Sequence, residues 1–280
     1  MISPKKIVFN GKSNEDFELI CDLCFESGDK GETSSFLSRK AVKTETYNGA
    51  FSRSYGMKYD EVFAPQITLM KRNFDDFDFE EQRAVLAWLT SKHTTGYMDV
   101  YMTNDDVATN SPSYCLLGGV TKIETYKLGN NRTVGIIFTF ESLHPYALSP
   151  IQTVDNKNAT TLTITCNTDD PGSFVYPKLT IYFNEGQNIT ITRIGDGNKE
   201  EQTIIKENIS GETIIIDSAN KIITSDRTVS RFFGDNFNWV WPKLTYGDNK
   251  FSVSRIPTPN SSNAPLVTFK YRYPIKCGQF

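Results

Sequence analysis

The sequence predicts a mainly β protein of two domains, and three observations support this prediction. Most of the chain alternates apolar and polar residues over short segments, which is the pattern of half-buried strands. Only residues 79–92 show a convincing helical period. The pattern is interrupted at Pro145 and Pro150, and 280 residues suit about two domains. We therefore expect a first domain over residues 1–147, sandwich-like or barrel-like with one α-helix, and a second domain over residues 148–280.

The first domain is organised around a strand that leads into the predicted helix, within residues 63–92. In this strand, Ile67 and Leu69 share one face, and Thr68 and Met70 take the other. This period of two is typical of a strand with one buried and one exposed face.

The helix has signals at its start, along its length and at its end. Asp78 is expected to accept from the first free amides as the N-cap, and Glu81 completes the spacing of a capping box. Lys92 and His93 suit the carboxyl end, where cations interact favourably with the last carbonyls. We expect one face of the helix to pack against an apolar surface. The residues of this face are Ala84, Val85, Trp88 and Leu89.

Further strands are expected on either side of this segment. Residues 114–126 and 133–141 predict a hairpin around a Gly-Asn-Asn turn. Residues 27–38 are small and polar, and we expect them to form an exposed loop or arm. The other strands expected in the first domain are residues 7–9, 17–25, 43–47, 57–63 and 97–102.

The second domain is predicted to be an antiparallel β-sandwich. After the two prolines, short alternating segments follow one another at spacings of about 8–12 residues, with turn residues between them. The turn residues include Gly186, Gly211 and Gly247-Asp248-Asn249. The expected strands are residues 162–166, 178–183, 188–194, 202–208, 213–217, 220–224, 237–241, 251–256 and 266–273.

Composition excludes several classes of function. The net charge is -3 and the chain has no basic run, so we expect no nucleic-acid partner. No apolar segment approaches the roughly 20 residues of a spanning helix, so we expect no membrane insertion. The first residues contain two lysines but no apolar core of a secretory signal, which indicates folding in the cytoplasm.

The five cysteines do not predict a disulfide framework or a metal site. Cys21 and Cys24 have CxxC spacing, but in a strand this odd separation directs them to opposite faces. Cys115, Cys166 and Cys277 are isolated in the sequence, and we interpret them as small buried hydrophobic residues or indifferent thiols.

Catalytic groups are scarce, and we expect no enzyme activity, no cofactor and no bound metal. The chain has two histidines: His93 suits the helix end, and His144 precedes a proline, where a packing role is expected. The acidic residues 75–81 do not have the alternating ligand spacing of a calcium-binding loop, and helix capping explains most of them. The acidic pairs at 105–106 and 200–201 are interpreted as loop carboxylates.

One row of aromatic residues has two interpretations. Phe237, Trp239 and Trp241 would share one face of a strand. Such a row fills the interior of a sandwich, which we favour, or it forms a stacking platform for sugar rings, which exposure of the rings would favour. Trp239 and Trp241 are therefore the candidate glycan contacts.

Four segments of the chain together match the pattern of one known family. The first is FNGKSNEDFEL, in which an Asn-Gly turn precedes a strand, and the second comprises FAPQITLMKRN and FEEQRAVLAWLTS, a strand and a helix that ends in a Trp-Leu pair. The third is VGIIFTFESLHPYALSP, between the two domains, and the fourth comprises the final strands, FNWVWPKLTYGDNKFSVS and LVTFKYRYP. In these segments the chain resembles the distal tail proteins of siphophages.

The resemblance implies both a fold and a role. Its members have an N-terminal β-domain with one helix that assembles into a homo-hexameric ring, and a C-terminal galectin-like sandwich that projects outward. The ring is the baseplate hub at the tail tip of a siphovirus virion. It joins the tail tube protein to tail-associated, fibre or receptor-binding proteins, and so takes part in host attachment. We place the ring contacts on the first domain, in the 27–38 arm and the strand edges.

Two other functions remain as alternatives. A carbohydrate-binding module or adhesin is suggested by Trp239 and Trp241 in a predicted sandwich, and a hydrolase ranks third. Galectin sugar sites use a set of residues that includes histidine, and residues 148–280 contain no histidine. For this reason we expect the second domain to act as a spacer or docking surface.

Overall fold

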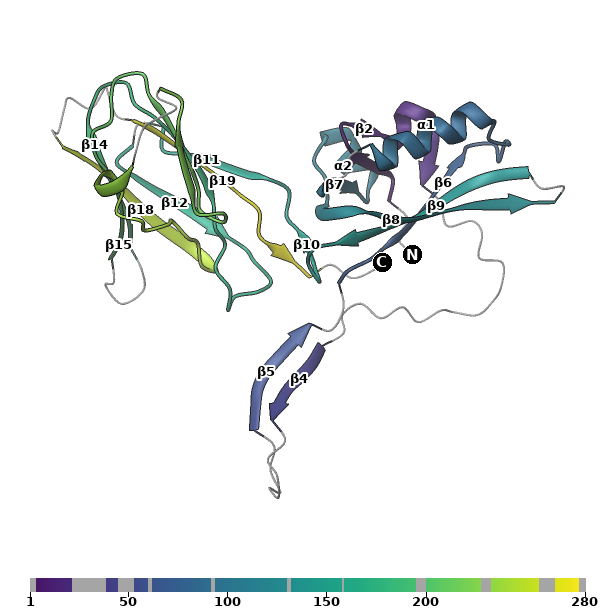
Figure 1. Ribbon diagram of the computed structural model, residues 1–280, viewed down its shortest axis with the longest axis horizontal. Helices are drawn as coiled ribbons and strands as arrows, with labels where there is room; N and C mark the ends of the chain where they lie inside the picture. Colours follow the sequence, from purple (N-terminus) through teal and green to yellow (C-terminus); the bar gives the residue numbers. More distant parts are fainter. Residues whose placement is uncertain are drawn as a thin grey trace. The chain divides into compact units, whose positions relative to one another are not determined.

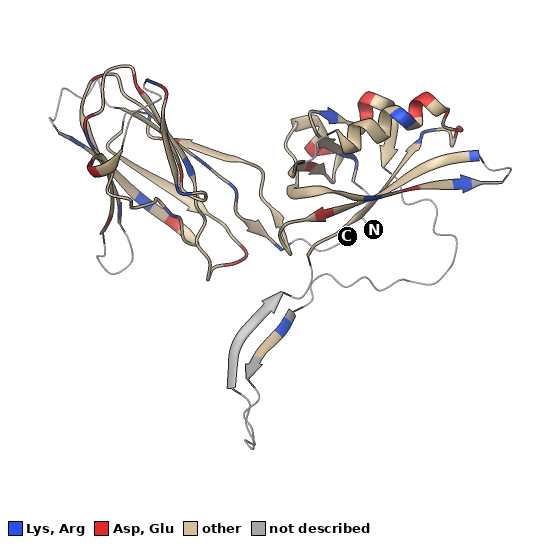
Figure 2. Ribbon diagram, viewed as in Figure 1, with Lys and Arg blue, Asp and Glu red and all other residues tan. Residues whose placement is uncertain are grey.

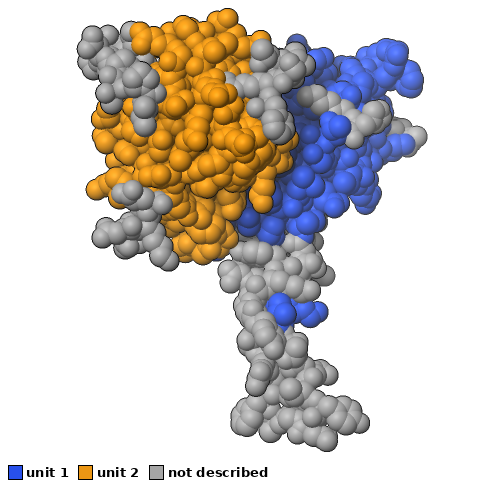
Figure 3. Space-filling model, turned by 60° about the vertical axis from the view of Figure 1, so that its left-hand side comes forward, with its two compact units in different colours: residues 1–150, 275–280 blue, residues 151–274 orange. Residues whose placement is uncertain are grey.

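The computed structural model describes residues 4–21, 39–44, 53–59, 62–91, 94–129, 132–157, 159–194, 200–227, 233–256 and 265–276. The chain divides into two compact units (Figure 3). Unit 1 comprises Met1–Pro150 and Ile275–Phe280, and unit 2 comprises Ile151–Pro274. The division falls after Pro150, and the last residues belong to unit 1, whereas the sequence analysis assigned everything from residue 148 to the second domain. Regular structure is mainly β and the strand pairs described are antiparallel, so the mainly β fold class is confirmed.

A nine-stranded sheet forms the body of unit 1 (Figure 1). Its main path runs β2-β1-β7-β8-β9-β6-β3, and β10 and β20 pair beside it. The strands are β1 (Lys6–Phe9), β2 (Lys12–Ser13), β3 (Leu19–Cys21), β6 (Gln66–Lys71), β7 (Gly96–Tyr101), β8 (Tyr114–Leu128), β9 (Arg132–Ser142), β10 (Ala147–Leu148) and β20 (Pro274–Ile275). Two further strands, β4 (Arg39–Thr44) and β5 (Arg53–Tyr59), pair only with each other. The 27–38 arm lies outside the described residues.

Helix α1 (Phe79–Thr90) begins as the sequence predicts. The Asp78 side chain accepts from the backbone N–H of Glu81 at 2.8 Å, and the Glu81 side chain accepts from that of Asp78 at 2.8 Å. Val85, Trp88 and Leu89 are buried, but Ala84 is exposed, so the predicted apolar stripe is wrong at that position. The helix ends two residues before the predicted limit, and Lys92 and His93 lie outside the described part of the chain.

Trp88 fixes α1 to the sheet. Its indole Nε1 donates to the backbone carbonyl of Phe9 in β1 at 2.7 Å, and its ring stacks on Phe17 with centroids 4.9 Å apart. A buried tryptophan needs a partner for its N–H, and β1 provides one. Together with Val85 and Leu89, Trp88 belongs to the buried cluster of unit 1.

Strand β6 corrects another expectation, because it is buried on both faces. Ile67, Thr68, Leu69 and Met70 are all buried, so the alternation between a buried and an exposed face is absent. The strand lies inside the sheet between β9 and β3. Thr68 is the one polar member of this run, which is why the sequence resembled a half-buried strand.

Three short helical turns were not predicted. They are η1 (Asn14–Phe17), α2 (Asn104–Thr109) and η2 (Gly234–Asn236). In α2, Thr103 and Asp106 form a capping box, and Asp106 also accepts from the Ser113 hydroxyl. These hydrogen bonds lower the pKa of Asp106, with the Ser113 bond as the largest cause. The acidic pair at 105–106 is therefore part of a helix start, and its interpretation as loop carboxylates was wrong.

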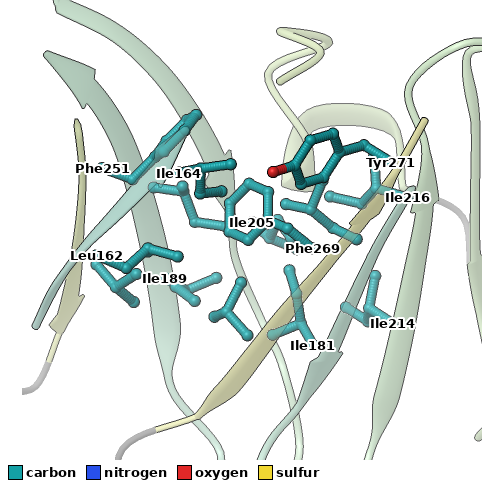
Figure 4. Close-up of a cluster of buried hydrophobic side chains, with 14 of the residues drawn as sticks. Leu162, Ile164, Ile181, Ile189, Ile205, Ile214, Ile216, Phe251, Phe269 and Tyr271 are labelled. Carbon is teal, nitrogen blue, oxygen red and sulfur yellow. The ribbon is translucent and has the colours of Figure 1, made fainter. Parts of the chain in front are cut away.

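Unit 2 consists of a five-stranded and a four-stranded sheet. The first has the order β11-β19-β13-β16-β17 and the second β12-β18-β14-β15. Figure 4 shows apolar side chains from both sheets pointing toward one another, and those of Ile164, Ile181 and Ile205 are completely buried. The strands are β11 (Gln152–Asp155), β12 (Thr161–Cys166), β13 (Lys178–Tyr182), β14 (Asn188–Ile194), β15 (Glu200–Ile205), β16 (Thr213–Asp217), β17 (Ile222–Ser225), β18 (Gly247–Ile256) and β19 (Leu266–Tyr271).

Three details of unit 2 differ from the predicted strands. Residues 237–241 form no strand, and only Phe237 makes an isolated bridge, to Ile205. Gly247-Asp248-Asn249, expected as a turn, begins β18 and pairs with the end of β12. Glu200 and Glu201, expected in a loop, belong to β15.

The hairpin of β8 and β9 is confirmed, and Gly118 is the point at which β8 changes its partner. Residues up to Gly118 pair with β7, and residues from Gly118 onward pair with β9. A Cβ atom added at Gly118 would lie 2.0 Å from the backbone oxygen of Glu141. At the neighbouring Gly119, an added Cβ would meet nothing within 4 Å.

Gly118→Ala is therefore expected to destabilise unit 1 by about 1–3 kcal/mol or more, because backbone atoms cannot move aside as a flexible side chain can. Gly119→Ala is the matched control and should change the unfolding free energy by less than about 1 kcal/mol. Denaturant unfolding of both variants, followed by circular dichroism, makes the comparison. Equal effects of the two substitutions would contradict this role of Gly118.

Candidate assembly surface and aromatic site

The distal half of β8 presents an exposed strand edge. From Gly119 to Thr125 the strand pairs with β9 on one side, and no strand of the described residues pairs with the other side. The side chains of Thr121, Lys122, Glu124 and Thr125 are exposed. An open edge offers backbone donors and acceptors to a strand of another chain.

Two features of this edge limit indiscriminate pairing. The register of β8 and β9 shifts between Val120 and Lys122, which is a bulge. Lys122 and Glu124 form an exposed ion pair at 2.9 Å. Bulges and charged residues are the usual protection of a strand edge, so they limit non-specific pairing at this one.

Strands β4 and β5 provide a second candidate contact surface in unit 1. They form an antiparallel pair that is separate from the nine-stranded sheet. An isolated pair of strands is only marginally stable in water, so packing against another surface would stabilise this pair.

Unit 1 has a groove of about 640 Å³ beside η1 and α1. Its lining includes Glu15, Glu18, Asp75, Glu81 and Lys71, and the acidic first turn of α1 is visible in Figure 2. Glu15 pairs with Lys6 at 2.8 Å, and Glu81 with Lys71 at 2.5 Å. No histidine or cysteine is among the described lining residues, so the groove has neither the usual base nor a thiol nucleophile.

His144 has a packing role. Its ring stacks on Tyr146, with centroids 5.5 Å apart and planes 3° apart, and its carbonyl accepts from the backbone N–H of Phe63 at 3.3 Å. Burial lowers its pKa. The other histidine, His93, lies outside the described part of the chain.

The described cysteines are dispersed. Cys115 is buried and its thiol donates to the Asp99 carboxylate at 2.7 Å, while Cys166 is buried in the core of unit 2. Cys21 is partly buried, and Cys24 and Cys277 lie outside the described ranges. Within those ranges, no three metal-ligating side chains gather in one place. The helices described are also too short and too polar to cross a membrane.

The aromatic residues of 237–241 come together, but not as a strand face. Phe237 is buried, Trp241 packs against the core from a partly exposed position, and Trp239 is 56% exposed. Trp239 has a φ of 58°, which breaks the alternation on which the strand prediction depended. The favoured interpretation, in which all three aromatic side chains fill the interior of the sandwich, is therefore wrong for Trp239.

The three rings form one cluster with edge-on contacts. Trp239 and Trp241 have centroids 6.3 Å apart, and Phe237 lies 5.5 Å from Trp239 and 5.1 Å from Trp241. The Trp239 indole donates to the carbonyl of Gly234 at 3.2 Å. The cluster therefore presents one exposed and one partly exposed indole next to the sandwich core.

Comparison with known families gives the class of this protein. A family model described as "Phage tail protein N-terminal domain" matches residues 3–142, and one described as "Phage tail C-terminal domain" matches residues 145–261. The two matches together cover most of the chain. The chain belongs to this family of phage tail proteins.

Solved structures from phage tails have the same fold. The SPP1 Dit (gp 19.1) protein, described as a paradigm of the hub adsorption apparatus in phages that infect Gram-positive bacteria, is similar with a TM-score of 0.61 and 9% identity. The similarity covers 96% of this chain and 98% of that one. A chain of the phage P2 baseplate in its activated conformation is similar with a TM-score of 0.53 and 10% identity, over 99% of both chains. No curated protein matches the chain.

The lowered pKa of His144 predicts a pH dependence. In the unfolded chain, His144 binds a proton near pH 6.5, whereas in the folded chain it does so only at lower pH. The stability that His144 contributes at neutral pH is therefore lost as the pH falls from the unfolded pKa to the folded pKa. His144→Gln removes this contribution. Its melting temperature should fall less than that of the wild type between about pH 7 and pH 5. An identical fall, measured by calorimetry, would show that His144 does not titrate differently on folding.

Proposed function

We propose that this chain is the ring-forming hub protein of a phage tail tip. In this role, copies of unit 1 contact one another around the ring, and the hub joins the tail tube to fibre, tail-associated or receptor-binding proteins. One observation supports this most strongly. Over 96% of its length, the chain shares its fold with a protein described as a hub of the adsorption apparatus.

The surface of unit 1 is suited to contacts between copies. The open edge of β8 and the separate β4–β5 pair both belong to this unit. A heterologous contact, in which one patch of a subunit meets a different patch of the next, generates a closed ring when the rotation returns to the first subunit. Six copies are the number that the resemblance to distal tail proteins implies.

The proposed role is structural. Catalysis needs a positioned nucleophile, base or metal in a cleft, and the groove beside α1 contains carboxylates with lysine partners instead. We accordingly propose a protein without enzyme activity, assembled in the host cytoplasm and present in the virion at the tail tip.

The first test is the molar mass of the purified full-length chain by multi-angle light scattering. One chain has a mass of 31.7 kDa, and we expect the mass of six or twelve chains, for one hexamer or two stacked hexamers. The double variant Thr121→Lys and Thr125→Lys adds charge to the β8 edge and should weaken assembly by about tenfold or more.

Thr161→Lys with Thr163→Lys is the matched control. These two threonines are exposed on β12, which is the edge strand of the four-stranded sheet in unit 2. This variant should assemble like the wild type. Equal loss of assembly in both double variants, or none in the β8 variant, would contradict a ring contact at this edge.

A further inference from the structure

Unit 2 has a surface cavity of about 510 Å³ that the proposed ring does not use. Its wall combines two aromatic rings with charged and amide groups. Its lining residues include Tyr176, Glu201, Gln202, Lys221, Trp241 and Lys243. These residues come from β15, from the turn between β16 and β17, and from two segments outside the regular strands.

Backbone bridges hold these segments in place. Val175, next to Tyr176, bridges to Leu244, next to Lys243, and Phe237 bridges to Ile205 at the end of β15. The Thr203 hydroxyl donates to the carbonyl of Val240 at 2.9 Å. The cavity wall is therefore fixed on both sides before any ligand arrives, which lowers the entropy cost of binding.

The charged groups that line the cavity carry an excess of positive charge. Glu201 pairs with Lys243 at 2.7 Å and with Arg193 at 3.6 Å. Lys243 also lies over the ring of Phe174, 4.3 Å from its centroid. Lys221 also lines the cavity, so the lining residues include two lysines and one carboxylate. Such a site favours an anionic ligand.

The aromatic groups suit sugar rings. Trp241 lines the cavity, and Tyr176 on the same wall is 44% exposed. Trp239 extends the aromatic surface beyond the cavity, since its ring centroid lies 6.3 Å from that of Trp241. Its φ of 58° lies in the left-handed region, which is sterically costly for a bulky residue.

We propose that this cavity binds an acidic polysaccharide, with a sugar ring against Trp241 and a neighbouring sugar of the same chain against Trp239. Gln202 and Glu201 bond sugar hydroxyls, because an amide both donates and accepts and a carboxylate accepts. Lys221 and Lys243 bind the anionic group of the polymer. The site depends on unit 2 alone, so the proposal does not rest on ring assembly.

Titration of the full-length chain with matched oligosaccharides tests this proposal. The acidic probes are trigalacturonate and a glucosylated glycerol-phosphate polymer, which distinguish a carboxylate from a phosphate as the anionic group. The neutral probe is galactotriose. Tryptophan fluorescence should show saturable binding of at least one acidic probe, about tenfold tighter than that of galactotriose and weakened by added salt.

Four variants locate the site. Lys221→Glu and Trp239→Ala change exposed side chains, so the fold should persist, and each should weaken binding by about tenfold. Lys250→Glu and Tyr246→Ala are the controls, because both residues are exposed in unit 2 and neither lines the cavity. The controls should bind like the wild type.

Three outcomes would overturn the proposal. They are no saturable binding of either acidic probe, equal binding of the acidic and neutral probes, and equal effects of the site and control variants. Light scattering on the same samples separates this test from that of the ring. A variant that loses binding but assembles normally would show that the two properties are independent.

Discussion

The structure of unit 1 depends on β8, a single strand of 15 residues that pairs with both β7 and β9. Its first third pairs with β7 and its remainder with β9, and only a glycine at position 118 lets the β9 backbone approach closely enough at the crossover. One end of the strand is therefore deep in the sheet, and the other end leaves it as a long hairpin with an open edge. The same strand thus contributes to the core of unit 1 and to its candidate surface for assembly.

In unit 2, the edge of strand β15 is covered by another segment of the chain. The segment around η2 lies along the outer strand β15, and Asn238 uses its side chain to accept from the N–H of Ile204 and to donate to the carbonyl of Gln202. This segment occupies an edge that would otherwise be open, so β15 is not available to another chain at these positions. The same segment turns sharply at Trp239, with the result that an indole reaches solvent beside the cavity. The proposed assembly surface and the proposed ligand site therefore belong to different units.

The sequence predicted those features that depend on local chemistry. The capping box of Asp78 and Glu81 involves residues three apart, and the alternation in most of unit 2 follows from sheets with one face in the core. Predictions from the sequence failed where contacts between distant parts of the chain determine the structure. Burial of β6 on both faces depends on its neighbours in the sheet. The positive φ of Trp239 cannot be read from the sequence, because Phe237, Trp239 and Trp241 still alternate with polar and aliphatic residues as in a strand. The cavity residues are far apart in the chain, so no local pattern could have grouped them.

The measurement that tests the central claim most directly is a cryo-electron microscopy reconstruction of the tail of a virion that carries this chain. The proposed function requires the chain to form one ring, or two stacked rings, at the distal end of the tail tube, with unit 1 providing the contacts between copies. Copies repeated along the whole tube would identify a tube protein instead. Isolated copies that project from the tip without touching one another would identify an attachment module and contradict the hub role.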